Sequence, residues 1–122
     1  MDIRECYISL GGNYDNVLAR LVSEERVKRF LLKFPDDKTY FELATATDHL
    51  DYEGSFRAAH TLKGICANLG LDRLCSSASA LCEYLRPERS GERSEGEINS
   101  LYATIAEDYK LTVAAIRAYG ES

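Results

Sequence analysis

The stretch Phe56-Arg57-Ala58-Ala59-His60-Thr61-Leu62-Lys63-Gly64 lies in the middle of the chain, and its residues repeat with the period of an α-helix. At about 100° per residue, one side of this helix collects the apolar side chains of residues 58–69, which are Ala58, Ala59, Leu62, Ile65, Cys66 and Leu69. His60 falls nearly opposite them. We therefore predict a helix that is buried along one side and carries an exposed histidine on the other.

Two cations flank this histidine on its own face, because Arg57 lies three residues before it and Lys63 three residues after it. Positive charge on both sides disfavours a metal ion and favours a phosphate. Gly64 removes a side chain from the same face, although a glycine within a helix costs roughly 1 kcal/mol relative to alanine. We interpret Gly64 as a gap for a closely approaching partner, the alternative being a glycine where another helix crosses.

Caps and helix breakers on both sides of the stretch mark further helices. Asp51 is a suitable N-cap for the central helix, and Gly70 is a suitable C-cap. Apolar spacing predicts helices over about 17–22, 24–34 and 38–49 before it, and over about 71–85 and 98–119 after it. Residues 87–96 carry almost no apolar side chains, so we expect a mobile surface loop there.

No long stretch alternates β-branched and polar residues, so we predict an all-α chain. Its three long apolar stripes can be buried only against one another, and an antiparallel helical bundle is the simplest arrangement that does so. The 122 residues have the length of a single domain, which we expect to span 1–122.

Composition excludes several classes of protein. Hydrophobic residues make up 45% of the chain and charged residues 29%, which is typical of a soluble globular protein. The net charge is −5 and the basic residues are scattered, which argues against nucleic-acid binding. No apolar run has the length of a signal peptide or of a membrane span, so we expect a cytoplasmic protein that does not bind membranes.

Four cysteines occur without a secretory signal, and we therefore expect reduced thiols rather than a disulfide framework. No Cys-x-x-Cys pair is present, which disfavours a structural zinc site.

The run His60-Thr61-Leu62-Lys63-Gly64, followed by Asn68-Leu69-Gly70, resembles the histidine-containing phosphotransfer (Hpt) domain family, the intermediate carriers of phosphorelays. The resemblance covers about residues 13–119. It implies an antiparallel four-helix bundle with one or two additional short N-terminal helices. It also implies a phosphocarrier in two-component signal transduction, without kinase activity of its own.

The resemblance assigns a role to each residue of the motif. His60 would be the phospho-acceptor, Lys63 the cation that steadies the phosphoryl oxygens, and Gly64 the gap that admits a receiver domain. Helix geometry adds Arg57 as a second cation, although it could equally be a solvated charge. Phe56 and Ala67 fall within about 40° of His60, so we expect them at the docking surface, Phe56 with some burial.

The sequence leaves two roles undecided at the next predicted helix, over about 71–85. Arg86, at its end, is a further candidate for the site. The family often has a polar side chain on this helix near the histidine, and Ser79 or another residue of 76–82 could fill that place.

The resemblance also implies the partners. A receiver domain of a response regulator or of a hybrid histidine kinase would donate a phosphoryl group from its phospho-aspartate, and another receiver would accept it. The Mg²⁺ ion would belong to the receiver, so we expect no cofactor and no metal in this chain. We expect a monomer.

Two other functions compete with this interpretation. A helical adaptor could bind a receiver or another partner without being phosphorylated, and phospho-acceptor domains of chemotaxis-type histidine kinases share the same helix chemistry. The chain ends shortly after its last predicted helix, which favours a free-standing carrier. His49, between Asp48 and Asp51, is predicted to be only a helix-end residue, because the two carboxylates would repel a phosphate.

Overall fold

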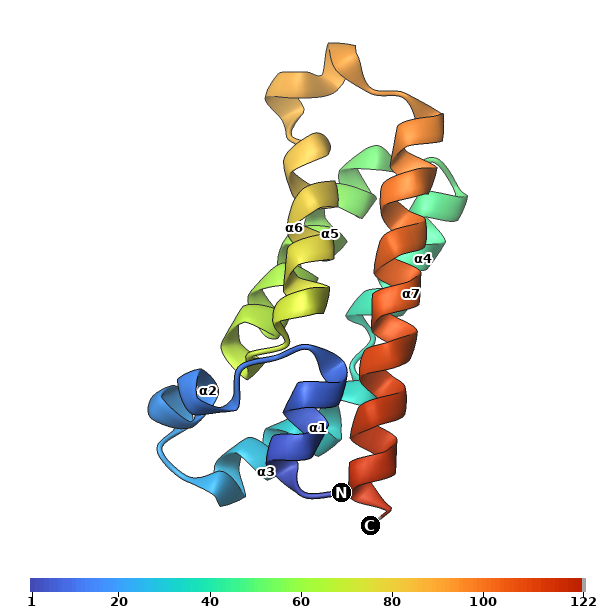
Figure 1. The fold of residues 1–122 in the computed structure, drawn as a ribbon. Coiled ribbons are helices and arrows are strands. Elements are labelled where there is room, and N and C mark those ends of the chain that lie inside the picture. Colours follow the sequence, from blue (N-terminus) through green and yellow to red (C-terminus); the bar gives the residue numbers. More distant parts are fainter. Residues whose placement is uncertain (122) are drawn as a thin grey trace.

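Helices are the only regular elements among residues 1–121, the part of the chain that the computed structural model describes (Figure 1). In chain order they are α1 (Ile3–Leu10), α2 (Tyr14–Leu21), α3 (Glu24–Lys33), the 3-10 helix η1 (Phe34–Asp36), α4 (Thr39–Asp48), α5 (Tyr52–Leu69), α6 (Asp72–Tyr84), the 3-10 helix η2 (Pro87–Glu92) and α7 (Glu95–Gly120). The predicted all-α fold class is confirmed.

The predicted caps define the central helix α5. The Asp51 carboxylate accepts the N–H of Gly54 at 2.9 Å and so starts the helix. Gly70 ends it with a φ of 70°, a left-handed conformation that glycine adopts without strain. Leu71 N–H then donates to the carbonyl of Cys66 at 2.9 Å, which satisfies one carbonyl of the last turn. The chain thereby reverses directly from α5 into α6.

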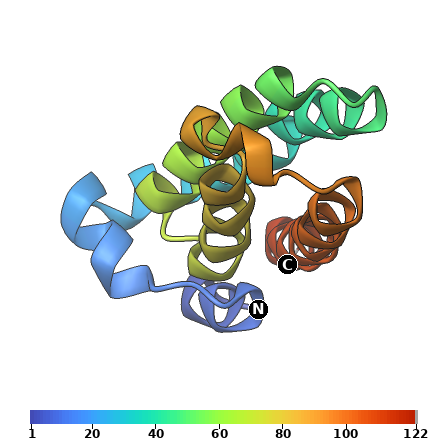
Figure 2. The same cartoon turned by 90° about the horizontal axis from the view of Figure 1, so that it is seen from above.

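Helices α4, α5, α6 and α7 pack as consecutive antiparallel neighbours, and Figure 2 shows them from above, with α6 and α7 seen nearly along their axes. Helix α5 packs against α4 on one side and against α6 on the other, and α7 closes the bundle against α6 and α4. The largest fully buried side chains come from most of the helices, and they are Tyr7, Leu10, Leu31, Leu43, Leu62, Leu71, Leu74, Leu81, Leu85, Ile98, Ile105 and Ile116.

Helix α7 has 26 residues and runs along the whole molecule, so α4 and α6 cover only part of its length (Figure 1). The remaining part packs against α1 and α3. Helix α1 was not predicted, although its buried residues Ile3, Cys6, Tyr7 and Leu10 have helical spacing. The structure therefore has three helices before α4, one more than the resemblance implied.

The N-terminal helices also hold the end of α5. The hydroxyl of Tyr7 donates to the carbonyl of Leu69 at 2.7 Å, and Arg20 donates to the carbonyls of Ala67 at 2.7 Å and Asn68 at 3.0 Å. The last carbonyls of a helix have no partner within it. Residues outside the bundle thus fix the C-terminal turn of its central helix.

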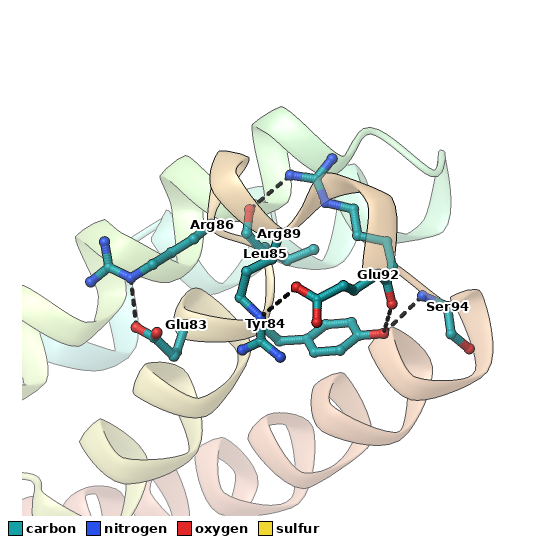
Figure 3. Close-up of polar contacts among 8 residues, drawn as sticks. Glu83, Tyr84, Leu85, Arg86, Arg89, Glu92 and Ser94 are labelled. Atoms are coloured by element: carbon teal, nitrogen blue, oxygen red, sulfur yellow. Dashed lines mark hydrogen bonds and ion pairs between the residues drawn. The ribbon is translucent and has the colours of Figure 1, made fainter.

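The segment after α6 is more ordered than its composition predicts. It forms η2, and Figure 3 shows the contacts that hold it. The hydroxyl of Tyr84 donates to the carbonyl of Glu92 at 3.1 Å and accepts the N–H of Ser94 at 2.8 Å. One aromatic side chain at the end of α6 therefore anchors a segment that has almost no apolar residues of its own.

We expect Tyr7→Phe to lower the free energy of unfolding by about 1–3 kcal/mol, because it leaves the buried carbonyl of Leu69 without its donor. Urea denaturation followed by circular dichroism would measure the change. Tyr119→Phe, which removes a hydroxyl from a half-buried tyrosine at the end of α7, is the control. Equal stability of the wild type and Tyr7→Phe would show that this hydrogen bond does not support the fold.

Candidate functional site

His60 lies in the middle of α5, and its side chain is exposed, as predicted. The helical period puts its neighbours Ala59 and Leu62 on the opposite side of α5, where both are completely buried. The ring of Phe56, one turn earlier, stacks beside the imidazole with 6.3 Å between the centroids and 22° between the planes. Phe56 is itself half-buried against the core. It therefore supports the imidazole and leaves little of its own surface for a docking partner.

Cys82 on α6 is the residue of the neighbouring helix that reaches the imidazole. Its sulfur lies 3.9 Å from Nδ1 of His60, and its side chain is only 1% exposed. Burial raises the pKa of the Cys82 thiol, while the positive charges of Lys63 and Arg86 partly oppose this effect. The thiol is therefore neutral at physiological pH. Cys82, and not Ser79, contacts the ring.

The positively charged side chains around His60 differ in their burial and in whether a carboxylate already binds them. Lys63 is half-buried and Arg57 is exposed, and neither forms a salt bridge within residues 1–121. Arg86 lies close enough to affect the Cys82 thiol, but its guanidinium is bound to the carboxylate of Glu83 (Figure 3). That hydrogen bond lowers the pKa of Glu83. Lys63 and Arg57 thus remain available to an anion at the imidazole.

Gly64 faces open space. A Cβ atom added to it would meet no other atom within 4 Å, apart from its own helix. No helix of the described chain crosses at this point, which removes the alternative explanation of Gly64 as a packing glycine. Ala67, the next small residue along the exposed strip, is also exposed. Together with His60 they form a strip of α5 that the bundle leaves bare.

A groove of about 720 Å³ between α4 and α5 borders this strip. Arg57 and Thr61 form its α5 side, and Phe41, which is 56% exposed, lies on its α4 side. A smaller hollow of about 230 Å³ lies near the other end of α5, and the 40% exposed Phe30 of α3 lines it. Neither aromatic side chain was singled out from the sequence. Both lie in the regions 24–34 and 38–49, whose apolar spacing was used only to predict helices.

Comparison with models of known protein families identifies the family of this chain. The family model of the Hpt domain matches residues 25–118, about three quarters of the chain. The chain belongs to the Hpt domain family. No curated protein and no solved structure gave a match. The match begins within α3 and ends within α7, so α1 and α2 lie outside the part that is typical of Hpt domains.

Membership in the Hpt family gives the chain a role in histidine phosphotransfer. The chain has two histidines, and the structure distinguishes them. His49 caps the end of α4, and its Nδ1 lies 2.8 Å from the carbonyl of Thr45. It is a helix-end residue, as predicted.

Within the described residues, no three His, Cys, Asp or Glu side chains are grouped so that they could hold a metal ion.

The contact between Cys82 and His60 was missed at the level of sequence, but a signal for it exists. In an antiparallel hairpin, residues at equal distances from the turn face each other. His60 precedes Leu71 by eleven residues and Cys82 follows Leu71 by eleven, whereas Ser79 lies level with Lys63. Counting outward from Leu71, the residue after the Gly70 cap, would therefore have selected Cys82. None of the helices in the described part of the chain combines the length and apolar content needed to cross a membrane.

Proposed function

We propose that His60 is the phospho-acceptor of this Hpt domain, and that it carries a phosphoryl group between receiver domains of a two-component phosphorelay. The observation that carries the proposal is the position of its imidazole, exposed in the middle of α5 between two available cations and beside the open Gly64. His49 is also exposed, but it lies at the end of α4 between Asp48 and Asp51, with no cation three residues away and no glycine beside it.

The reaction needs little from the chain beyond positioning and charge. A ring nitrogen of His60 attacks the phosphorus of an aspartyl phosphate, a P–N bond forms, and the P–O bond to the aspartate breaks. The leaving group is the aspartate carboxylate of the receiver, which keeps the electron pair. The reverse steps load the next receiver. No proton has to be removed from the imidazole nitrogen that attacks, because in neutral histidine it carries a free lone pair.

Lys63 and Arg57 are suited to stabilise the phosphoryl oxygens during this transfer. Phosphoryl transfer places charge on the equatorial oxygens, and cations held nearby stabilise that charge. Lys63 is the better placed of the two, since it is half-buried and its charge acts on Cys82, which contacts the His60 ring, whereas Arg57 is exposed and lies at the edge of the α4–α5 groove. In this proposal the Mg²⁺ ion is carried by the receiver domain.

A receiver domain would dock over the bare strip of α5. Gly64 and Ala67 allow its backbone to come close, and Arg57 offers positive charge to the acidic site of a receiver. The exposed aromatic side chains of Phe41 and Phe30 border the strip on the side of α4 and α3, opposite the side covered by α6. Phe56 contributes through the imidazole that it supports.

We expect His60→Gln to abolish phosphorylation by receiver domains charged with a small acyl phosphate. Transfer would be followed by phosphate-affinity electrophoresis at neutral pH, because phosphohistidine is labile to acid. His49→Gln is the matched control, and we expect it to accept phosphate at the wild-type rate. A His60→Gln protein that still became phosphorylated would refute the proposal. Receiver binding by a wild type that never becomes phosphorylated would instead identify an adaptor.

Gly64→Ala separates docking from folding. We expect this variant to be more stable than the wild type by about 1 kcal/mol, since alanine favours the helix and its Cβ meets no neighbour. We also expect slower transfer, because the new methyl group occupies the space left for the receiver. Urea denaturation and the transfer assay would measure the two effects.

Gly91→Ala, in η2, is the control for the transfer rate, because a Cβ atom there also meets open space. A Gly64→Ala protein that transferred phosphate as fast as the wild type would remove Gly64 from the docking surface.

A further inference from the structure

We propose that Cys82 is the positioning residue for His60: the Nδ1–H of the imidazole donates to the thiol sulfur, which leaves the lone pair on Nε2 to receive the phosphoryl group. This inference rests on the proposed role of His60 as phospho-acceptor. It adds which side chain of this protein holds the ring of His60.

The position of Cys82 follows from the hairpin. The Gly70 turn joins α5 directly to α6, so that His60 and Cys82 face each other across the interface between these helices. The sulfur and Nδ1 are 3.9 Å apart, at the long end of the range for a hydrogen bond to sulfur, which is a weak acceptor. Because Nδ1 is directed at α6 while the side chain as a whole is exposed, Nε2 is the nitrogen that remains for a partner.

The direction of the hydrogen bond decides the chemistry. A neutral imidazole has one N–H and one lone pair. If the thiol donated to Nδ1, the proton would sit on Nε2, and the outer nitrogen would have no lone pair with which to attack phosphorus. If Nδ1–H donates to the sulfur, Nε2 is the nucleophile. Only the second arrangement supports phosphotransfer at the exposed nitrogen.

The neighbours of the pair fit this arrangement. Burial keeps the thiol protonated, so the sulfur accepts the hydrogen bond without adding a negative charge beside an incoming phosphate. Phe56 stacks beside the ring from the previous turn of α5 and limits its rotation. Lys63 of α5 and Arg86 at the end of α6 act on Cys82 through their positive charge. The thiol thus orients the imidazole without a negative charge, and Lys63, which forms no salt bridge among the described residues, is left for the phosphate.

The tautomer of His60 tests the proposal directly. Nitrogen-15 NMR of the full chain distinguishes Nδ1–H from Nε2–H, and with two histidines the signals can be assigned from a His49→Gln sample. His49 is an internal reference, because its Nδ1 faces the carbonyl of Thr45, which can only accept a hydrogen bond. At a pH at which the nitrogen-15 shifts themselves report neutral rings, we expect His60 to be predominantly Nδ1–H as well.

Two substitutions remove the sulfur in different ways. Cys82→Ala leaves a small cavity, while Cys82→Val keeps a similar volume without an acceptor. We expect both to shift His60 toward the Nε2–H tautomer and to slow phosphotransfer by roughly five- to tenfold, the effect of losing one weak hydrogen bond. Cys75→Ala is the matched control, since the Cys75 thiol lies on the same helix but faces the carbonyl of Lys63 at 3.7 Å.

The possible results separate this inference from the proposed function. A wild-type His60 that is mainly Nε2–H, or a tautomer that neither Cys82 variant changes, would overturn the role of Cys82 even if transfer proceeds. A shift in Cys82→Ala alone would assign the effect to packing and would also overturn it. A mainly Nδ1–H His60 that responds to both variants, in a chain that no receiver phosphorylates, would confirm the pairing and contradict the proposed function.

Discussion

Helix α5 has to be buried along one side and bare along the other, and the rest of the molecule depends on this division. Its apolar residues need neighbouring helices, while a reactive histidine needs open space. The bundle satisfies both because α4 and α6 flank α5 and leave one strip uncovered. Ala59 and Leu62, which are completely buried, bracket an exposed His60 within a single turn.

The other elements hold this helix in place. Asp51 fixes its first turn and the Gly70 reversal fixes its last. Arg20 and Tyr7, which lie outside the part matched by the Hpt family, bind the carbonyls that the last turn leaves free. At the other end, Arg93 of the segment after η2 lies over the ring of Tyr52, the first residue of α5. A rigid helix presents a reactive group more accurately than a loop can, which explains why so much of the structure serves α5.

Much of the fold and the core of the site could be predicted from the sequence, because helical period and caps are local properties. The exposure of His60 and the ends of α5 follow from residues within the helix itself. Helix α1 was missed because its stability comes from packing on α7, at the opposite end of the chain, and a short helix is marginal without such packing. The exposure of Phe30 and Phe41 could not be predicted, because it depends on how far neighbouring helices extend. The contact between Cys82 and His60 required the pairing of two helices across a turn.

The central claim is that His60 carries the phosphoryl group, and mapping the modified residue tests it most directly. The wild-type chain would be loaded by a phosphorylated receiver, digested at neutral pH and analysed by electron-transfer fragmentation, which preserves the P–N bond. We predict a phosphoryl group on His60 and none on His49. A phosphoryl group found on another residue, with His60 unmodified, would contradict the assignment of His60 as the phospho-acceptor.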